Sequence, residues 1–212
     1  MKTLAIPAAQ YLAHSQYLAA MHELRAKIFS GRLGWDVSVG RGQEHDEYDD
    51  LDPTYILALT DSNAVAACAR LLPATGPTML ERTFPQLLAK GSLDAHVGMV
   101  ESSRFCVDTS RAVGRAGGVL HRATLTMFAS IIEWSMASGY SEIVTATDLR
   151  FERILNRAGW PMERLGDPCP IGNTIAVAGR LPANLASLER VRPEGYRSNL
   201  TETGPAHIRS AA

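Results

Sequence analysis

Acidic residues crowd into one short stretch of the sequence. The run EHDEYDDLD at residues 44–52 holds six Asp or Glu, although the whole chain carries a net charge of only −1. A metal loop, a solvated linker and a pocket for a cationic substrate would each concentrate charge in this way. An EF-hand calcium loop needs a glycine that this run lacks, and His45 has no partners at zinc-ligand spacing. The pattern therefore argues against a metal and leaves the linker and the cation pocket open.

A small-residue stretch, RAVGRAGG at residues 111–118, is a second candidate site. It contains the pattern R-x-x-G-x-A, formed by Arg111, Gly114, Arg115 and Ala116. Small residues let the backbone approach a phosphate, and a helix that follows presents free N–H groups and the positive end of its dipole. An ordinary strand-to-helix connection with solubilising arginines would explain the same residues, so both interpretations stay open here.

The elements that must position these residues follow from periodicity and turn residues. Helical spacing predicts a helix over 14–29, and the glycine-rich stretch after it is expected to be mostly loop. The alternation of strands and helices beyond residue 54 predicts one mixed α/β domain, with a loose tail at 193–212. The strands are expected at 54–60, 64–72, 99–108, 142–148 and 174–181, and the helices at 83–89, 118–138, 151–159 and 183–191.

Bulk composition narrows the class of protein. The chain has 212 residues, 46% of them hydrophobic, which suits a single domain with one sizeable core. The 21 Lys and Arg against 22 Asp and Glu argue against a protein that coats nucleic acid. Three widely spaced cysteines, no signal peptide and no long apolar run predict a cytoplasmic protein with no membrane partner.

Five fragments occur in a specific order: LRAKIF (24–29), LGWD (33–36), EHDEYDDLDPTYIL (44–57), CARLLP (68–73) and VESSRF (100–105). This ordered set resembles the acyl-homoserine-lactone synthases, the autoinducer synthases of bacterial quorum sensing. The match covers residues 24–106, with a looser fit to about residue 180. The residues that the family holds in common map, without departure, onto Arg25, Phe29, Trp35, Asp46, Asp49, Arg70, Glu101, Ser103 and Arg104.

The resemblance implies a fold and a reaction. The fold would be that of the Gcn5-related N-acetyltransferases, a mixed and mostly antiparallel sheet flanked by helices. Residues 1–212 would form one synthase domain, with residues 1–53 as a mobile cover over the substrate. The amine of S-adenosylmethionine would attack an acyl thioester, and lactonisation would then release 5′-methylthioadenosine. Both molecules would be substrates, and no tightly bound cofactor is implied.

The implied binding residues suit a sulfonium substrate on physical grounds. Asp46 and Asp49 would stabilise the positive charge, and Phe29 and Trp35 would cover the adenine or the sulfonium. The arginines would hold carboxylates, either the substrate's own or, as an arginine–carboxylate network, those of the acidic run. Taken singly, each residue has an ordinary alternative as a solvated charge, core packing or a buried ion pair. The S-adenosylmethionine set comprises Arg25, Phe29, Trp35, Asp46, Asp49, Arg70 and Arg104, whereas Glu44, Glu47, Asp50 and Asp52 are assigned to solvent or local capping.

The implied catalytic residues are Glu101, Ser103 and Arg104. Glu101 is the candidate general base, directly or through a water, and Ser103 would orient the thioester or the base. Backbone N–H groups of residues 103–106 would stabilise the oxyanion. A general N-acyltransferase acting on another amine is the alternative, and a non-catalytic module that binds acyl ligands is a third possibility.

The acyl donor is either acyl-coenzyme A or acyl carrier protein. The loop at 111–118 favours coenzyme A, and the ESSRFCVDT stretch resembles the subgroup that accepts coenzyme A esters of branched or aromatic acids. The residues assigned to the donor are Arg111, Gly114, Arg115, Phe105 and Cys106, and those assigned to the acyl pocket are Met127, Ile143, Thr145 and Thr147.

Overall fold

A twisted sheet runs through the middle of the computed structural model, which describes residues 1–109, 115–116, 120–198 and 200. All neighbouring strands of this sheet are antiparallel except β6 and β9, which are parallel. The path through the sheet is β1 (Lys2–Ile6), β4 (Thr54–Leu59), β5 (Val65–Pro73), β6 (Met99–Val107), β9 (Glu142–Asp148), β12 (Thr174–Pro182) and β10 (Glu163–Arg164), and β11 (Cys169–Ile171) also pairs with β12.

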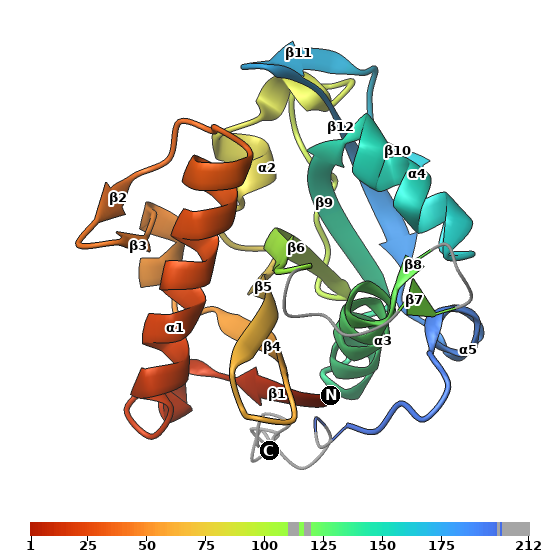
Figure 1. Ribbon diagram of the computed structural model, residues 1–212. Coiled ribbons are helices and arrows are strands. Elements are labelled where there is room, and N and C mark those ends of the chain that lie inside the picture. Colours follow the sequence, from red (N-terminus) through yellow and green to blue (C-terminus); the bar gives the residue numbers. More distant parts are fainter. Residues whose placement is uncertain (110–114, 117–119, 199, 201–212) are drawn as a thin grey trace, which may run out of the picture.

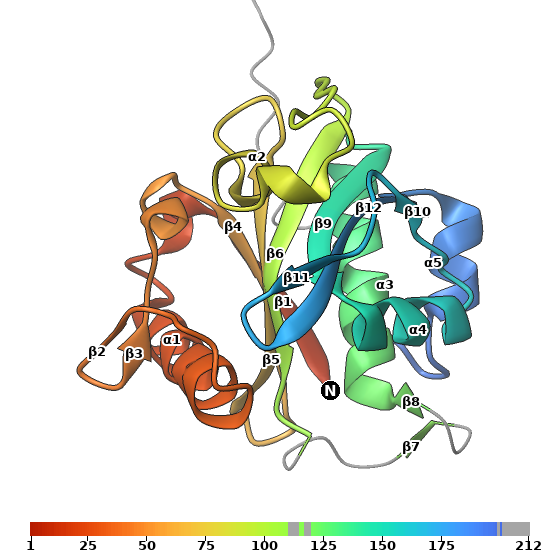
Figure 2. The ribbon, with the colours of Figure 1, turned by 90° about the horizontal axis from the view of Figure 1, so that it is seen from above.

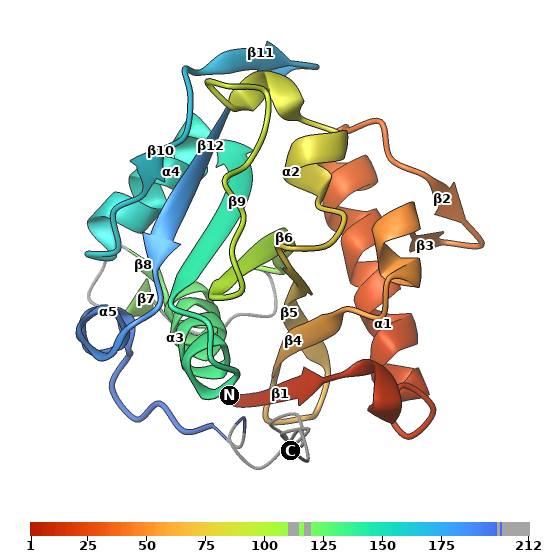
Figure 3. The ribbon, with the colours of Figure 1, turned by 180° about the vertical axis from the view of Figure 1, so that it is seen from behind.

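Helices cover both faces of the sheet (Figures 1 and 2). One face carries α1 (Ser15–Ala26), which continues into a π-helical turn, η2 (Lys27–Arg32). The other carries α3 (Arg122–Ala137), α4 (Leu149–Arg157) and α5 (Leu185–Val191). The short helix α2 (Met79–Arg82) lies between the α1 side and β9 in the view from behind (Figure 3). The minor elements are β2 (Val39–Gly40), β3 (Gln43–Glu44), β7 (Arg115–Ala116), β8 (Leu120–His121), η1 (Ala8–Gln10), η3 (Glu47–Asp50) and η4 (Pro85–Leu87).

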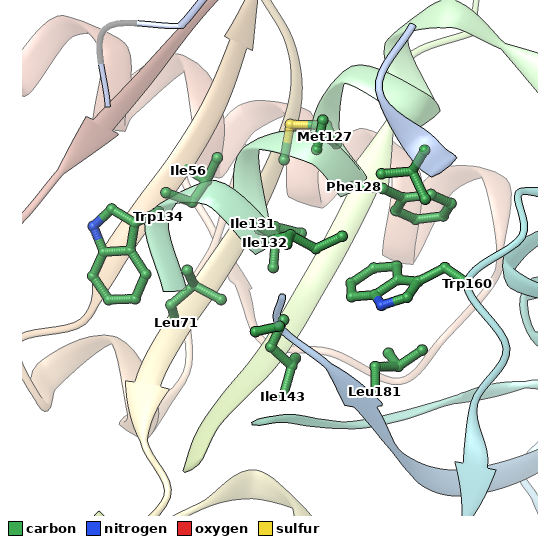
Figure 4. Packing of buried hydrophobic residues seen from close by; sticks show 14 of the residues in the cluster. Ile56, Leu71, Met127, Phe128, Ile131, Ile132, Trp134, Ile143, Trp160 and Leu181 are labelled. Carbon is green, nitrogen blue, oxygen red and sulfur yellow. The ribbon is translucent and has the colours of Figure 1, made fainter. Parts of the chain in front are cut away.

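The largest hydrophobic cluster fills the space between the sheet and α3 (Figure 4). Phe128 and Ile132 of α3 are at most 1% exposed, and they pack with Ile143 of β9 and with Trp160. The indole N–H of Trp160 donates to the carbonyl of Pro182 at 2.9 Å, so its one polar atom is satisfied. Complete burial of these apolar side chains is the main stabilising contribution on this face.

The sheet divides at β6, and this division opens the site. β6 and β9 pair only from Met99 to Glu101, and no pairing continues beyond that point between the two strands. Further along β6, Ser103 pairs with Arg70 and Cys106 with Cys68, so two residues of β6 face one residue of β5. This is a β-bulge, and Arg104 within it has a φ of 53°. A bulge bends its strand, and this one lies in the part of β6 that is no longer paired with β9.

The expected elements beyond residue 54 are largely confirmed, and the strand at 142–148 has the predicted bounds. Gly139 and Gly159, with φ of 84° and 77°, end α3 and α4 as helix-terminating glycines do. The helix predicted at 83–89 is wrong, because α2 begins at Met79 with Thr78 as its cap and only a 3₁₀ turn follows.

Two expectations about the chain ends need correction. Strand β1 was not predicted, and it extends the central sheet by pairing with β4, so the whole of residues 1–53 does not form a separate cover. The tail after Pro193 is not loose over its described part. Tyr196 and Ser198 each donate to Glu133 of α3 at 2.6 Å, and Leu200 is 0% exposed. Residues 201–212 lie outside the described residues, and the mobility of the N-terminal part stays a prediction.

Candidate active site

A buried ion network stands at the base of the site. Two buried arginines, Arg25 of α1 and Arg70 of β5, have side chains that are 0% exposed. Arg25 donates to both oxygens of Asp49 at 2.7 and 2.8 Å and to Glu44. Arg70 donates to Asp49 at 2.9 Å and to Asp46. Charged groups in the interior need such partners, because unpaired burial of a charge is very costly.

The third arginine lies at the surface of this network. Arg104 donates from Nε to Glu44 at 3.0 Å, and its Nη2 lies 2.7 Å from Asp46. Its guanidinium carbon also stands 5.6 Å from the centre of the Phe29 ring. Since its side chain is 10% exposed, Arg104 connects the buried network with the open side of the site.

The network shifts the pKa values of its carboxylates. Burial alone would raise the pKa of Asp49, but hydrogen bonds and charge from Arg25, together with the charge of Arg70, outweigh burial and hold it well below its usual range. The same balance holds for Asp46. Burial would raise its pKa, but the hydrogen bond and charge of Arg70 outweigh burial and lower it. Both groups are therefore ionised at neutral pH, and their charges are already matched by arginines.

An aromatic pair forms one wall. The rings of Phe29 and Trp35 stack with centroids 5.3 Å apart and an interplanar angle of 4°. The backbone N–H of Trp35 donates to the carbonyl of Phe29 at 2.9 Å just after the π-helical turn, and this bond helps to hold the two rings together. Single π-helical turns within helices are frequently found at functional sites.

Glu101 and Ser103 come from β6, where that strand leaves β9. The carboxylate of Glu101 is buried and accepts the backbone N–H groups of Met79 and Leu80 at 3.0 and 2.7 Å. Burial raises the pKa of Glu101, and these two hydrogen bonds and Arg70 oppose the rise without cancelling it. The Ser103 hydroxyl accepts from Nε of Arg70 at 3.0 Å. No His–Asp pair stands beside Ser103 within the described part of the chain, so it lacks the surroundings of a nucleophile.

Two cavities adjoin at this place. The first, of about 550 Å³, opens between β6 and β9, with Ser103 and Phe105 on one side and Thr145 and Thr147 on the other. Its lining is mainly apolar and includes Phe84, Leu87, Phe151 and Ile171 as well as the ring of Trp35. The second, of about 590 Å³, is lined by acidic and polar groups: Asp36, Ser38, His45, Asp46, Glu47, Tyr48, Asp50 and Thr83, with Val37, Met79 and Arg104.

The predicted site residues divide into three groups. Phe29, Trp35, Glu101, Ser103, Arg104, Phe105, Thr145 and Thr147 line the first cavity, and Asp46 lines the second. Arg25, Asp49 and Arg70 lie behind the cavity walls in the network. Met127, Ile143 and Cys106 do not reach a cavity. Met127 and Ile143 point into the core on the far face, and Cys106 packs under α1 with its sulfur 3.4 Å from that of Cys68.

The prediction that Met127 and Ile143 line the acyl pocket is therefore wrong. Met127 lies on the α3 face of the sheet, and along β9 the side chains alternate, so that Ile143 is buried in the core. Arg111 and Gly114 lie outside the described residues, and only the backbone of Arg115 is described. Their assignment to the donor stays a prediction.

The sequence also left some site residues unassigned. Glu44, expected at the solvent or in a local cap, is 0% exposed and joins Arg25 to Arg104. Tyr55 donates to Asp49 at 2.7 Å. One sequence feature could have indicated that Glu44 faces the network. In an extended chain residues 44 and 46 point to the same side, so Glu44 shares a side with Asp46 while His45 between them is exposed.

The described residues contain neither a metal cluster nor a membrane-spanning helix. No group of three or more His, Cys, Asp or Glu side chains there could hold a metal ion. Likewise, none of the helices in this part of the chain is long and apolar enough to cross a membrane.

Comparisons with known proteins bear directly on this arrangement. The family model described as autoinducer synthase matches residues 9–191. The chain belongs to the autoinducer synthase family. Within this family, the acyl-homoserine-lactone synthase of Agrobacterium fabrum is 64% identical over 212 residues, which is the full length of both chains. The acyl-homoserine-lactone synthase of Pseudomonas aeruginosa is 36% identical over 170 residues, with 79% of this chain and 83% of the other covered.

Solved structures agree with the family assignment. The AHL synthase LasI is 32% identical, with a TM-score of 0.77 and coverage of 90% of this chain and 93% of that one. The CoA-dependent acyl-homoserine lactone synthase BjaI, solved with SAM and isopentyl-CoA, is 25% identical, with a TM-score of 0.82 and coverage of 97% and 94%. An acyl-CoA N-acyltransferase from Pseudomonas aeruginosa, 15% identical with a TM-score of 0.54, shares the fold alone. The predicted N-acetyltransferase-like fold of this autoinducer synthase is thereby confirmed.

Proposed function

We propose that this chain is an acyl-homoserine-lactone synthase. In the reaction, the α-amino nitrogen of S-adenosylmethionine attacks the carbonyl carbon of an acyl thioester, and the thiol leaves. The methionyl carboxylate then attacks its own γ-carbon and expels 5′-methylthioadenosine. The observation that carries the proposal is the junction of an apolar cavity with an acidic one, because this reaction must bring an acyl chain and a cationic amine together.

Each cavity suits one substrate in this proposal. The apolar cavity between β6 and β9 would take the acyl chain, since burial of apolar surface supplies its binding energy. The acidic cavity would take S-adenosylmethionine, which carries a sulfonium and an ammonium. The stacked rings of Phe29 and Trp35 stand at the apolar side of this junction, where aromatic faces attract cations.

The buried network would act through position, and not by direct contact with substrate. Asp49 and Arg70 have side chains that are at most 1% exposed, so neither can touch a molecule in the cavities without rearrangement. Arg70 holds Asp46, and Arg25 holds Glu44, which in turn fixes Arg104 at the surface of the site. Arg104 would then meet the methionyl carboxylate with a guanidinium that is already fixed in direction.

Glu101 remains our candidate for the general base. Its raised pKa lies closer to neutral pH than that of an exposed glutamate, which is the direction a base needs. Both of its oxygens accept backbone N–H groups of α2, so the carboxylate is fixed in orientation. We propose that backbone N–H groups of the β6 bulge donate hydrogen bonds to the oxyanion. A bulge disrupts regular strand pairing, so such N–H groups can be left available as donors.

For the donor we propose acyl-coenzyme A, with acyl carrier protein as the alternative. The supporting observations are the small-residue pattern at 111–118 and the likeness to BjaI, a synthase described as CoA-dependent. We also propose a cytoplasmic location. Cys68 and Cys106 are free thiols whose sulfurs lie only 3.4 Å apart, as suits a reducing compartment.

One assay tests the function. The protein is mixed with S-adenosylmethionine and a panel of straight, branched and aromatic acyl-coenzyme A esters or acyl carrier proteins, and products are identified by mass spectrometry. We expect 5′-methylthioadenosine and an acyl-homoserine lactone in equal amounts. An acyl amide without methylthioadenosine would instead indicate a general N-acyltransferase, and no product with any donor would rule out the synthase.

The matched variant in this assay is Glu101→Gln, which keeps the shape and removes the charge. General base catalysis contributes about 10²- to 10⁴-fold, so we expect kcat to fall at least 100-fold. The acid limb of the pH–rate profile, which reports the base, should also disappear. A variant as active as the wild type would remove Glu101 from the mechanism.

A further inference from the structure

Five residues line both cavities: Asp36, Val37, Met79, Thr83 and Arg104. In the proposed function the amine from one cavity must reach the thioester carbon in the other, so the reacting atoms meet among these five. Only Asp36 and Arg104 carry a formal charge. Arg104 belongs to the residue set matched by the family resemblance, whereas Asp36 has no role assigned so far.

The other carboxylates at the cavities are already engaged. Asp46 accepts from both Nη atoms of Arg70 and lies beside Arg104. Glu101 accepts two backbone N–H groups. Asp148 caps α4 by accepting the N–H of Phe151 at 2.7 Å. Glu47 and Asp50 line the acidic cavity alone, so they do not belong to the residues shared by the two cavities.

Asp36 differs from all of these. It is exposed, and among the described residues its carboxylate has no hydrogen bond or ion pair. Its backbone is nevertheless held on both sides. Trp35 before it stacks on Phe29, and the Ser38 carbonyl after it accepts the N–H of His45 at 3.2 Å. A free carboxylate on an anchored segment, facing both cavities, is arranged to receive a positive charge.

We propose that Asp36 binds the cationic part of S-adenosylmethionine at the junction of the two cavities. This inference rests on the proposed function and names a binding residue within it. Asp36 and Arg104 would act as a pair of opposite charges, one toward the cation and the other toward the methionyl carboxylate. The two charges also fix the direction of the substrate, because exchanging its ends would bring like charges together.

We expect the contact of Asp36 to affect the binding of S-adenosylmethionine and not the rate of the chemical step. The sulfonium becomes a neutral thioether when it leaves, and the ammonium must lose its proton before attack. A carboxylate beside the cation therefore stabilises the transition state no more than it stabilises the bound substrate. Removing it should therefore raise the KM for S-adenosylmethionine while kcat is kept.

The test is the kinetics of Asp36→Asn, with both substrates varied in turn. We expect kcat/KM for S-adenosylmethionine to fall five- to tenfold, kcat to stay within threefold and the KM for the thioester to stay within twofold. Asp94→Asn is the control, because Asp94 is an exposed aspartate outside both cavities. A KM for S-adenosylmethionine within twofold of the wild type would overturn the inference.

A second measurement identifies the cation and does not depend on turnover. S-adenosylhomocysteine keeps the ammonium but lacks the sulfonium, and its binding can be measured by calorimetry. If it binds Asp36→Asn more weakly than the wild type, Asp36 faces the ammonium; equal binding with a raised KM for S-adenosylmethionine assigns the sulfonium. The proposed function fails separately, if the wild type itself releases no methylthioadenosine.

Discussion

Two sets of arginine–carboxylate pairs in this molecule have nearly the same geometry and very different surroundings. Arg25 grips Asp49 through two hydrogen bonds of 2.7 and 2.8 Å, and both side chains are at most 1% exposed. At the β10 edge of the sheet, Arg180 donates to Glu163 through two hydrogen bonds of 2.9 and 2.8 Å, and the two side chains are 43% and 67% exposed. Distance alone cannot tell these pairs apart.

Burial decides what each pair does. In water, a pair gains little over two hydrated ions, and salt screens what remains. In the interior, each charge depends on its partner, because a lone buried charge is strongly unfavourable. The buried set also shares partners, since Asp49 accepts from Arg25, Arg70 and Tyr55 together. It therefore holds α1, β4 and β5 in one arrangement around the site, whereas the exposed pair joins β10 and β12 at the edge of the sheet, with Glu142 of β9 3.8 Å from Arg180.

The largest expected effect is that of Asp49→Asn. The amide keeps the size of the side chain but leaves two buried arginines short of negative charge, so we expect a loss of about 3–5 kcal/mol in unfolding free energy. Urea unfolding followed by circular dichroism measures it. The control is Asp52→Asn in the same acidic run, where the aspartate is exposed and little change is expected. Equal stability of the two variants would contradict the contrast drawn here.

The pH dependence of stability should show the same contrast with a smaller effect. The folded-state pKa values of Asp46 and Asp49 lie below the unfolded value of about 3.9. Their stabilisation is therefore complete above about pH 5 and is lost as the pH falls through the unfolded value and below it. Glu101, with a raised pKa, acts in the opposite sense.

The measurement is the difference in unfolding free energy between wild type and Asp49→Asn. We expect it to stay level between pH 5 and 7 and to shrink as the pH falls from 4 to 3. Because Glu101 is present in both proteins, its contribution cancels. A difference that stays constant down to pH 3 would mean that the charge of Asp49 is not what stabilises the network.

The smallest effect is expected for Glu163→Gln at the exposed pair. Loss of the Glu163 charge should leave the urea midpoint of unfolding unchanged within experimental error, because water replaces this partner of the exposed Arg180. Activity should also be unchanged, since Glu163 lines neither cavity. A clear fall in the midpoint would show that geometry, and not burial, sets the strength of these pairs.

The sequence by itself determined the family and most of the elements of the fold. Strong local patterns were enough for this. EIVTATD gave the bounds of β9, the apolar periodicity of residues 118–138 indicated α3, and the ordered fragments from LRAKIF to VESSRF indicated the family. The grouping of Arg25, Asp46, Asp49, Arg70 and Arg104 was likewise expected as an arginine–carboxylate network.

Only the tertiary structure decided how those residues face one another. It buried Glu44 against Arg104, 60 positions away, and turned Met127 and Ile143 into the core. It also placed Asp36 where it lines both cavities. Strand β1, whose short sequence KTLAI has no turn signal before it, took its place at the edge of the sheet. Burial and partners arise from contacts between distant segments. Local periodicity records which side of an element is apolar, and it carries no information about what the other side will meet.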